Sequence, residues 1–146
     1  MAIPEKLAQI VGLFASVPRD VKLQALLDYS RRLPVLPAEL VGSDRFERVD
    51  ECQSPLFLHA EIADGGAVTL YFDAPQEAPT TRGFAGILAE GLAEATVDEI
   101  LALPDDFYMD LGLESVVSPL RMRGMGAMVF RIKRQLRRQL DDRGDA

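Results

Sequence analysis

The sequence has little of what disulfides, metal sites and membrane spans require. It contains one cysteine, Cys52, and one histidine, His59. One cysteine forms no internal disulfide, and the two residues together are too few ligands for a zinc or iron–sulfur site within one chain. The first residues include Glu5 and Lys6 and lack the long apolar run of a signal peptide or a membrane span. We therefore expect a cytosolic chain with no bound metal and no membrane contact.

Positive charge is also scarce, because 16 lysines and arginines face 23 aspartates and glutamates and leave a formal net charge of −7. Nucleic-acid binding needs an electropositive face, so we expect no nucleic-acid partner. The sequence has no Walker loop and no dinucleotide-type glycine pattern, so we expect no nucleotide cofactor.

The cations gather between Val116 and Leu140, where there is no carboxylate. From Arg131 onward we interpret them as solvated charges that offset the negative end of a helix dipole. Arg121 and Arg123 lie near the start of the same predicted helix and gain nothing from that dipole. They need another explanation.

The N-terminal part predicts two helices. Apolar residues at helical spacing begin after Pro4, and the first helix ends at Val17-Pro18, since a residue before proline is pushed out of the helical region. A second helix runs from Pro18 to about Arg32 and stops before two Leu-Pro pairs. Its broad apolar face is expected to comprise Val21, Leu23, Leu26, Leu27 and Tyr29.

The middle of the chain predicts a small antiparallel sheet. Residues 46–49 are compatible with a short edge strand, and residues 55–62 alternate with period two, which places Leu58, Ala60 and Ile62 on one side. An Ala-Asp-Gly-Gly turn at 63–66 supplies the positive φ angles of a hairpin, and residues 67–73 form the return strand.

The C-terminal part predicts helices again. One helix spans about 80–95, and Thr96 with Glu99 forms a capping box for a short helix to residue 103. Another short helix ends near Gly112, and Ser118-Pro119 supplies an N-cap and a first-turn proline for the last helix. The apolar positions of this last helix are expected to include Leu120, Met125, Met128, Val129, Ile132 and Leu136. Residues 1–146 are therefore expected to form a single α+β domain.

Cys52 stands just before a predicted strand, among polar residues that favour a loop. A free cysteine is by default a small buried hydrophobe, whereas this position favours an exposed thiol. The position of Cys52 alone slightly favours a reactive thiol over a buried cysteine without a chemical role.

Several segments, in this order and spacing, resemble the SufE family. Cys52-Gln53-Ser54 before an apolar strand is the first of them. The others are Tyr29-Ser30-Arg31-Arg32-Leu33-Pro34, Ala63-Asp64-Gly65, Leu111-Gly112-Leu113, Ser118-Pro119-x-Arg121-x-x-Gly124 and Arg131-Ile132-Lys133. The resemblance covers about residues 4–137. It implies a SufE-like or NifU-like fold, in which a small antiparallel sheet packs against several helices.

The resemblance also implies a function. Cys52 would accept persulfide sulfur from a pyridoxal-phosphate-dependent, SufS-like cysteine desulfurase and pass it to a scaffold for iron–sulfur cluster assembly. Glu51, Gln53, Ser54 and Arg121 would contact the desulfurase. The chain would have no cofactor of its own and would serve as an accessory protein, not as a stand-alone enzyme.

Glu51 departs from the family pattern, which has glycine before the reactive cysteine. A carboxylate at this position disfavours the thiolate and is expected to raise the pKa of Cys52. A positive field would then have to come from the desulfurase or from Arg121. Two alternatives remain open: a thiol enzyme that uses His59 as its base, and an interaction module in which Cys52 is incidental.

Overall fold

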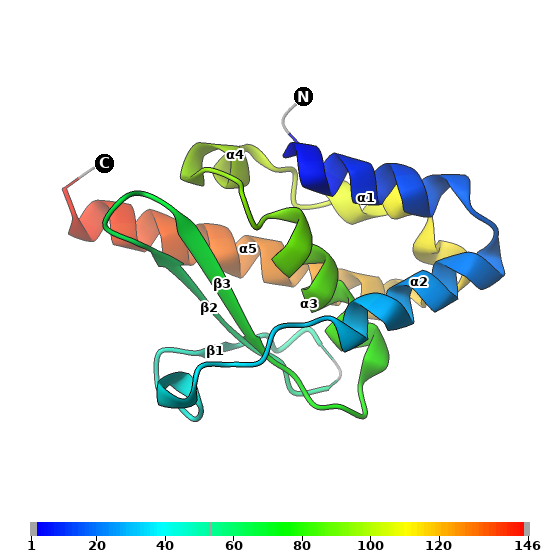
Figure 1. Ribbon diagram of the computed structural model, residues 1–146, viewed down its shortest axis with the longest axis horizontal. Coiled ribbons are helices and arrows are strands. Elements are labelled where there is room, and N and C mark those ends of the chain that lie inside the picture. Colours follow the sequence, from blue (N-terminus) through cyan, green and yellow to red (C-terminus); the bar gives the residue numbers. More distant parts are fainter. Residues whose placement is uncertain (1–2, 53, 145–146) are drawn as a thin grey trace.

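Helices surround a small antiparallel sheet in the computed structural model, which describes residues 3–52 and 54–144 (Figure 1). The described elements, in chain order, are α1 (Glu5–Ser16), α2 (Arg19–Arg31), η1 (Ala38–Leu40), β1 (Glu47–Arg48), β2 (Phe57–Ile62), β3 (Val68–Asp73), α3 (Pro79–Gly91), α4 (Val97–Ala102), η2 (Phe107–Leu111), η3 (Leu113–Ser115) and α5 (Pro119–Asp142). The predicted α+β class is confirmed.

The sheet has the strand order β1-β2-β3, and both pairings are antiparallel. Its turn is closed by Ala63, whose backbone N–H donates to the Ala67 carbonyl at 2.8 Å. Gly66 supplies a φ of 90°, as a tight hairpin requires. Leu58, Ala60 and Ile62 are buried while the residues between them are half-buried, so the predicted alternation of β2 is confirmed.

Helix α5 is joined to the edge of β2 by side-chain hydrogen bonds. β1 pairs only with Phe57 and Leu58, which leaves the next backbone groups of β2 without a strand partner on that side. Gln135 accepts a hydrogen bond from the Ala60 N–H at 2.7 Å, and Gln139 accepts one from the Ile62 N–H at 2.9 Å. These glutamines complete the ladder where the strand stops. They also fix α5 beside the sheet (Figure 1).

Helix α3 lies between the α1–α2 pair and the sheet (Figure 1). It buries Phe84, Ile87 and Leu88 almost completely. A Cβ atom on Gly86 would lie 2.3 Å from the Tyr29 carbonyl oxygen, so the missing side chain lets α2 and α3 approach closely. The resulting hydrophobic core extends from α1 to α5 and includes Cys52.

Two predicted helix starts are confirmed. Both hydrogen bonds of the Thr96–Glu99 capping box are present, at 2.9 and 3.1 Å. The Ser118 hydroxyl accepts a hydrogen bond from the Arg121 backbone N–H at the start of α5.

Three helix details are corrected. The apolar face of α2 is narrower than predicted, because Val21 and Leu23 are 47% and 44% exposed and the face is limited to the side that meets α3. Helix α3 ends at Gly91, before residue 95. Leu120, expected in the apolar stripe of α5, is 48% exposed because it lies in the first turn, ahead of the packed part of the helix.

Candidate functional site

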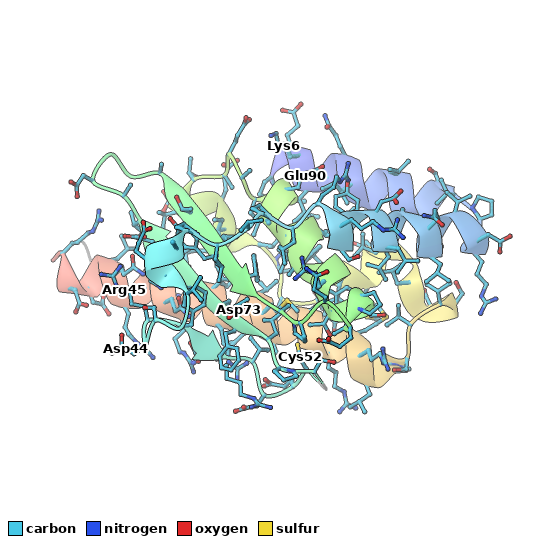
Figure 2. The ribbon with its side chains drawn as sticks, turned by 60° about the horizontal axis from the view of Figure 1, so that its bottom comes forward. Lys6, Asp44, Arg45, Cys52, Asp73 and Glu90 are labelled. Carbon is cyan, nitrogen blue, oxygen red and sulfur yellow. The ribbon has the colours of Figure 1, made fainter. Side chains whose placement is uncertain are left out.

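Cys52 lies in the connection between β1 and β2, which we call the Cys52 loop (residues 50–55). The two residues that bound this loop, Val49 and Leu56, are fully buried. The Val49 N–H donates to the Leu56 carbonyl at 2.9 Å, and the Cys52 N–H donates to the Val49 carbonyl at 3.2 Å. The ends of the loop are therefore fixed in the core, while Cys52 between them lies beside α5 (Figure 2).

The thiol is buried, with Cys52 only 7% exposed. The expectation of an exposed thiol is wrong. It rested on the polar neighbours of Cys52, whereas burial depends on Gly124 of α5, which is distant in sequence. A Cβ atom at position 124 would lie 2.9 Å from the Cys52 sulfur, so the glycine leaves the space that the thiol occupies.

An ion pair joins the residue before the cysteine to the same helix. Arg131 Nη1 lies 2.7 Å from Glu51 Oε1, and Arg131 Nε lies 3.3 Å from Glu47 Oε2. Glu47 is held in turn by Arg134 and by Gln135, whose Nε2 donates to it at 3.1 Å. Nε and Nη1 of Arg131 are buried and find no well-directed hydrogen bond among the described residues, so the attraction to the carboxylates is mainly coulombic.

The interpretation of the cations from Arg131 onward as solvated charges is wrong for the first three. The side chain of Arg131 is only 12% exposed. Lys133 is buried and pairs with Asp105 at 2.8 Å, and Arg134 pairs with Glu47. Their partners come from β1, the Cys52 loop and the segment before η2, and nothing local in the helix sequence marks them. Arg137 and Arg138 are exposed, as expected.

Burial raises the pKa of the Cys52 thiol to about 11, with a further upward contribution from the Glu51 carboxylate and a smaller opposing one from Arg131. The expected direction of the Glu51 effect is confirmed. The cation that acts on the thiol is Arg131, not Arg121. Glu51 itself is unstrained, because none of the described non-glycine residues has a positive φ.

Three of the four predicted contact residues lie at or near the Cys52 loop, and the fourth, Gln53, lies outside the described residues. Glu51 is exposed apart from its contact with Arg131, and Ser54 is half-buried. Arg121 is exposed in the first turn of α5, three residues before Gly124 and thus on the same side of the helix.

Sequence reasoning missed two residues of the site, Gly124 and Arg131. Gly124 carried a signal, because a glycine in the middle of a long helix is unfavourable and calls for a packing reason. Arg131 lies in a family-like segment, but nothing local predicts its pairing with Glu47 and Glu51, since both are distant in sequence.

His59 lies on the other face of β2 from the buried leucines. Its ring stacks on Tyr71 at 5.9 Å between centroids, and Phe46 lies at the same distance. Burial lowers the pKa of His59, although Glu61 partly opposes that shift. Cys52 belongs to the core on the Leu58–Ala60–Ile62 face of β2, whereas His59 packs against Phe46 and Tyr71 on the opposite face, so His59 is not positioned as the base for the thiol.

Metal binding and membrane insertion each need a recognisable arrangement of residues. Within residues 3–52 and 54–144, no three His, Cys, Asp or Glu side chains are grouped to hold a metal ion. No helix in the described part of the chain is both long and apolar enough to cross a membrane.

Comparison with known proteins identifies the family of this chain. The family profile "SufE: Fe-S metabolism associated domain" matches residues 8–136, which includes the Cys52 loop, Gly124 and Arg131. The chain belongs to the SufE family. The resemblance inferred from sequence is confirmed, and SufE membership connects the chain with iron–sulfur metabolism.

Named relatives agree on the family, and a solved structure agrees on the fold. The chain is 54% identical to an uncharacterized SufE-like protein of Mycobacterium tuberculosis, over 93% of this chain and 94% of that protein. It is 25% identical to the cysteine desulfuration protein SufE of Plasmodium vivax, over 82% of this chain and 48% of that protein. The solution structure of a hypothetical protein from Thermus thermophilus is 42% identical, with a TM-score of 0.84, and the match covers 95% of this chain and 98% of that one. The SufE-like fold is thereby confirmed.

Proposed function

We propose that this chain is a sulfur carrier that accepts persulfide sulfur on Cys52 from a pyridoxal-phosphate-dependent cysteine desulfurase. The observation that carries the proposal is one thiol on a loop with fixed ends, buried against a glycine of α5 in a SufE domain. The description of the Plasmodium relative as a cysteine desulfuration protein supports the same assignment.

The transfer step resembles thiol–disulfide exchange. The Cys52 thiolate attacks the outer sulfur of the desulfurase persulfide and forms a new S–S bond. The bond between the donor cysteine and that sulfur breaks, and its electron pair stays on the donor sulfur as a thiolate. Cys52 now carries the persulfide, and no outside oxidant or reductant is needed.

The closed loop is unsuited to this attack. With a pKa of about 11, roughly one Cys52 thiol in ten thousand is ionised at pH 7. A buried sulfur also has no access to a donor. We therefore infer that the Cys52 loop moves away from α5 when the desulfurase binds, which exposes the thiol and removes the burial that raises its pKa.

The surface for the desulfurase is proposed to include the Cys52 loop and the start of α5. Arg121 is an exposed cation one turn from Gly124, and the exposed apolar side chain of Leu120 stands beside it in the chain. Arginine is enriched at protein–protein interfaces, and it often contributes strongly to binding there. Glu51, Gln53 and Ser54 flank the thiol and would meet the partner as the loop opens.

After transfer the loop is proposed to close again over the persulfide. The apolar surroundings that bury Cys52 would keep water and soluble reductants away from it. An acceptor such as an iron–sulfur scaffold would then have to open the loop a second time. A lone cysteine suits this role, since a neighbouring thiol would convert the persulfide to a disulfide and release sulfide.

The decisive experiment is mass spectrometry of the intact chain after incubation with a cysteine desulfurase, pyridoxal phosphate and cysteine. We expect the mass to rise by one or more sulfur atoms, located on Cys52 and removed by dithiothreitol. Cys52→Ser should gain no sulfur while still binding the desulfurase. An unmodified wild-type chain that binds the desulfurase would instead identify an interaction module with an incidental cysteine.

A further inference from the structure

Two neighbouring loop residues meet α5 at two separate points. Cys52 meets the helix at Gly124, and Glu51 meets it at Arg131. These helix positions are seven residues apart, which is about two turns or roughly 10 Å along one side of an α-helix. The loop is therefore attached to α5 by one apolar contact and one charged contact.

The apolar contact requires a glycine. A Cβ atom at position 124 would lie 2.9 Å from the Cys52 sulfur, 3.7 Å from its Cα and 3.9 Å from its Cβ. Real Cβ atoms are essentially never as close as the first of these distances. Any other residue at position 124 would have to displace the thiol or the loop. Glycine is otherwise one of the least favourable residues in the middle of a helix.

The two partners of the charged contact, Arg131 and Glu51, differ in how firmly their side chains are held. Arg131 is nearly buried and is held by Glu47, which Arg134 and Gln135 also contact. Glu51 is about half exposed and reaches the arginine from the loop. Loss of the pair would therefore free the Glu51 side of the loop and leave the arginine held by Glu47.

We propose that Gly124 and the Glu51–Arg131 ion pair are positioning elements that hold Cys52 in an unreactive closed loop, so that the thiol reacts only when this contact with α5 is released. The inference deepens the proposed function, because sulfur acceptance would then begin with that release. In this chain Glu51 occupies the position where the resemblance leads one to expect glycine. The charged half of the closure thus depends on the residue that departs from the family pattern.

The experiment measures alkylation of Cys52 by iodoacetamide in the free chain, from pH 7 to pH 11 and without desulfurase. Gly124→Ala should react faster than wild type at pH 8, by at least about tenfold, with a ceiling near a hundredfold if the pKa returns from about 11 to the ordinary value of 9.0. Its pH midpoint should fall in parallel. Gly12→Ala is the control, because Gly12 is an exposed glycine of α1 with nothing within 4 Å of an added Cβ.

Glu51→Gln tests the charged contact. We expect alkylation at pH 8 to be several-fold faster than in wild type, and we expect added sodium chloride to accelerate wild type but not this variant, since salt screens the pair. Asp50→Asn is the matched control: it removes a charge from the same loop, but Asp50 pairs with Arg48 at 3.5 Å and not with α5. It should alkylate at the wild-type rate and keep the salt dependence.

Wild-type rates and pH midpoints in both Gly124→Ala and Glu51→Gln would overturn the proposal, as would equal acceleration in Asp50→Asn. If Gly124→Ala shows no cooperative unfolding transition, it is not folded and its alkylation rate is not used. The alkylation rate of Glu51→Gln and the effect of salt then decide whether the proposal holds. The test uses only a small alkylating agent. A chain that behaves as expected here yet takes up no sulfur from a desulfurase would therefore refute the proposed function and leave the closed loop intact.

Discussion

The two halves of α5 are attached to the rest of the molecule in different ways. The C-terminal half is joined to β2 by Gln135 and Gln139 and buries Ile132 and Leu136 in the core. The N-terminal half meets the Cys52 loop through Gly124, and its first turn leaves Leu120 and Arg121 at the surface. Arg131 stands at the boundary, held by Glu47 on one side and by Glu51 on the other.

This difference separates stability from reactivity. Changes in the C-terminal half should weaken the fold and leave the native thiol as it is. Changes at the loop contact or in the first turn should alter the chemistry of Cys52 or its encounter with a partner at little cost in folding. Four substitutions or conditions, ordered by their expected effect on the free energy of unfolding, test that separation.

Leu136→Ala should have the largest effect. Leu136 is fully buried in the C-terminal half, so removing most of its side chain should lower the free energy of unfolding by about 2–5 kcal/mol. Urea denaturation measures this loss, and Leu120→Ala in the same helix is the exposed control. An alkylation rate that rises under native conditions without a loss of stability would contradict the separation.

Gln135→Ala should cost about 1–3 kcal/mol, because the buried Ala60 N–H loses its acceptor. Gln24→Ala, on the exposed surface of α2, should change the stability by less than about 0.5 kcal/mol. Both variants should keep the wild-type pH midpoint for alkylation, because Arg134 still holds Glu47 beside Arg131 when Gln135 is lost. If the two substitutions lower the free energy of unfolding by the same small amount, the proposed role of Gln135 at the edge of β2 is wrong.

Alkaline pH should destabilise the wild-type chain through Cys52. The folded-state pKa is about 11 against an ordinary 9.0, so the protonated thiol is favoured in the folded state. Its contribution to stability is fully present below about pH 9 and is lost as the pH rises through 11. The urea midpoint should fall between pH 8 and pH 10.5, and it should fall further in wild type than in Cys52→Ser. The Cys52→Ser variant corrects for the titration of other groups. Equal falls would show that the thiol is not buried in solution.

Arg121→Ala should have the smallest effect on folding, below about 0.5 kcal/mol, because the side chain is exposed in the first turn of α5. It should leave alkylation of the free chain unchanged and lower the kcat/KM of sulfur transfer from a desulfurase by about tenfold, as expected for the loss of one charged contact. Arg123→Ala, exposed two residues further along, is the control. A slower transfer in both variants would point to overall charge and not to a specific contact.

Local rules predicted most of the fold. The alternation along β2, the Thr96 capping box and the Ser118 N-cap each depend on residues within one strand or one helical turn, and all three are confirmed. The errors concern which side of a correctly predicted element meets a neighbour. Val21 and Leu23 have the composition of a core face, but α3 covers only part of α2.

The sequence was enough to choose Cys52 as the candidate site residue, but it was not enough to predict the burial and the charges around it. Cys52 could be chosen because it is the sole cysteine and stands in a family-like motif. Its burial depends on Gly124, and its charged surroundings depend on Arg131, both supplied by a helix that follows the sheet and two intervening α-helices. No local pattern around position 52 contains that information.

The central claim is that the Cys52 thiol is shielded in the free chain and exposed by its sulfur donor. It is tested most directly by the pH profile of iodoacetamide alkylation, measured for the free chain and for its complex with a cysteine desulfurase whose own reactive cysteine is replaced by serine. We expect a midpoint near 11 for the free chain and a clearly lower midpoint with faster alkylation in the complex. The same high midpoint in both, although sulfur still reaches Cys52, would contradict the claim.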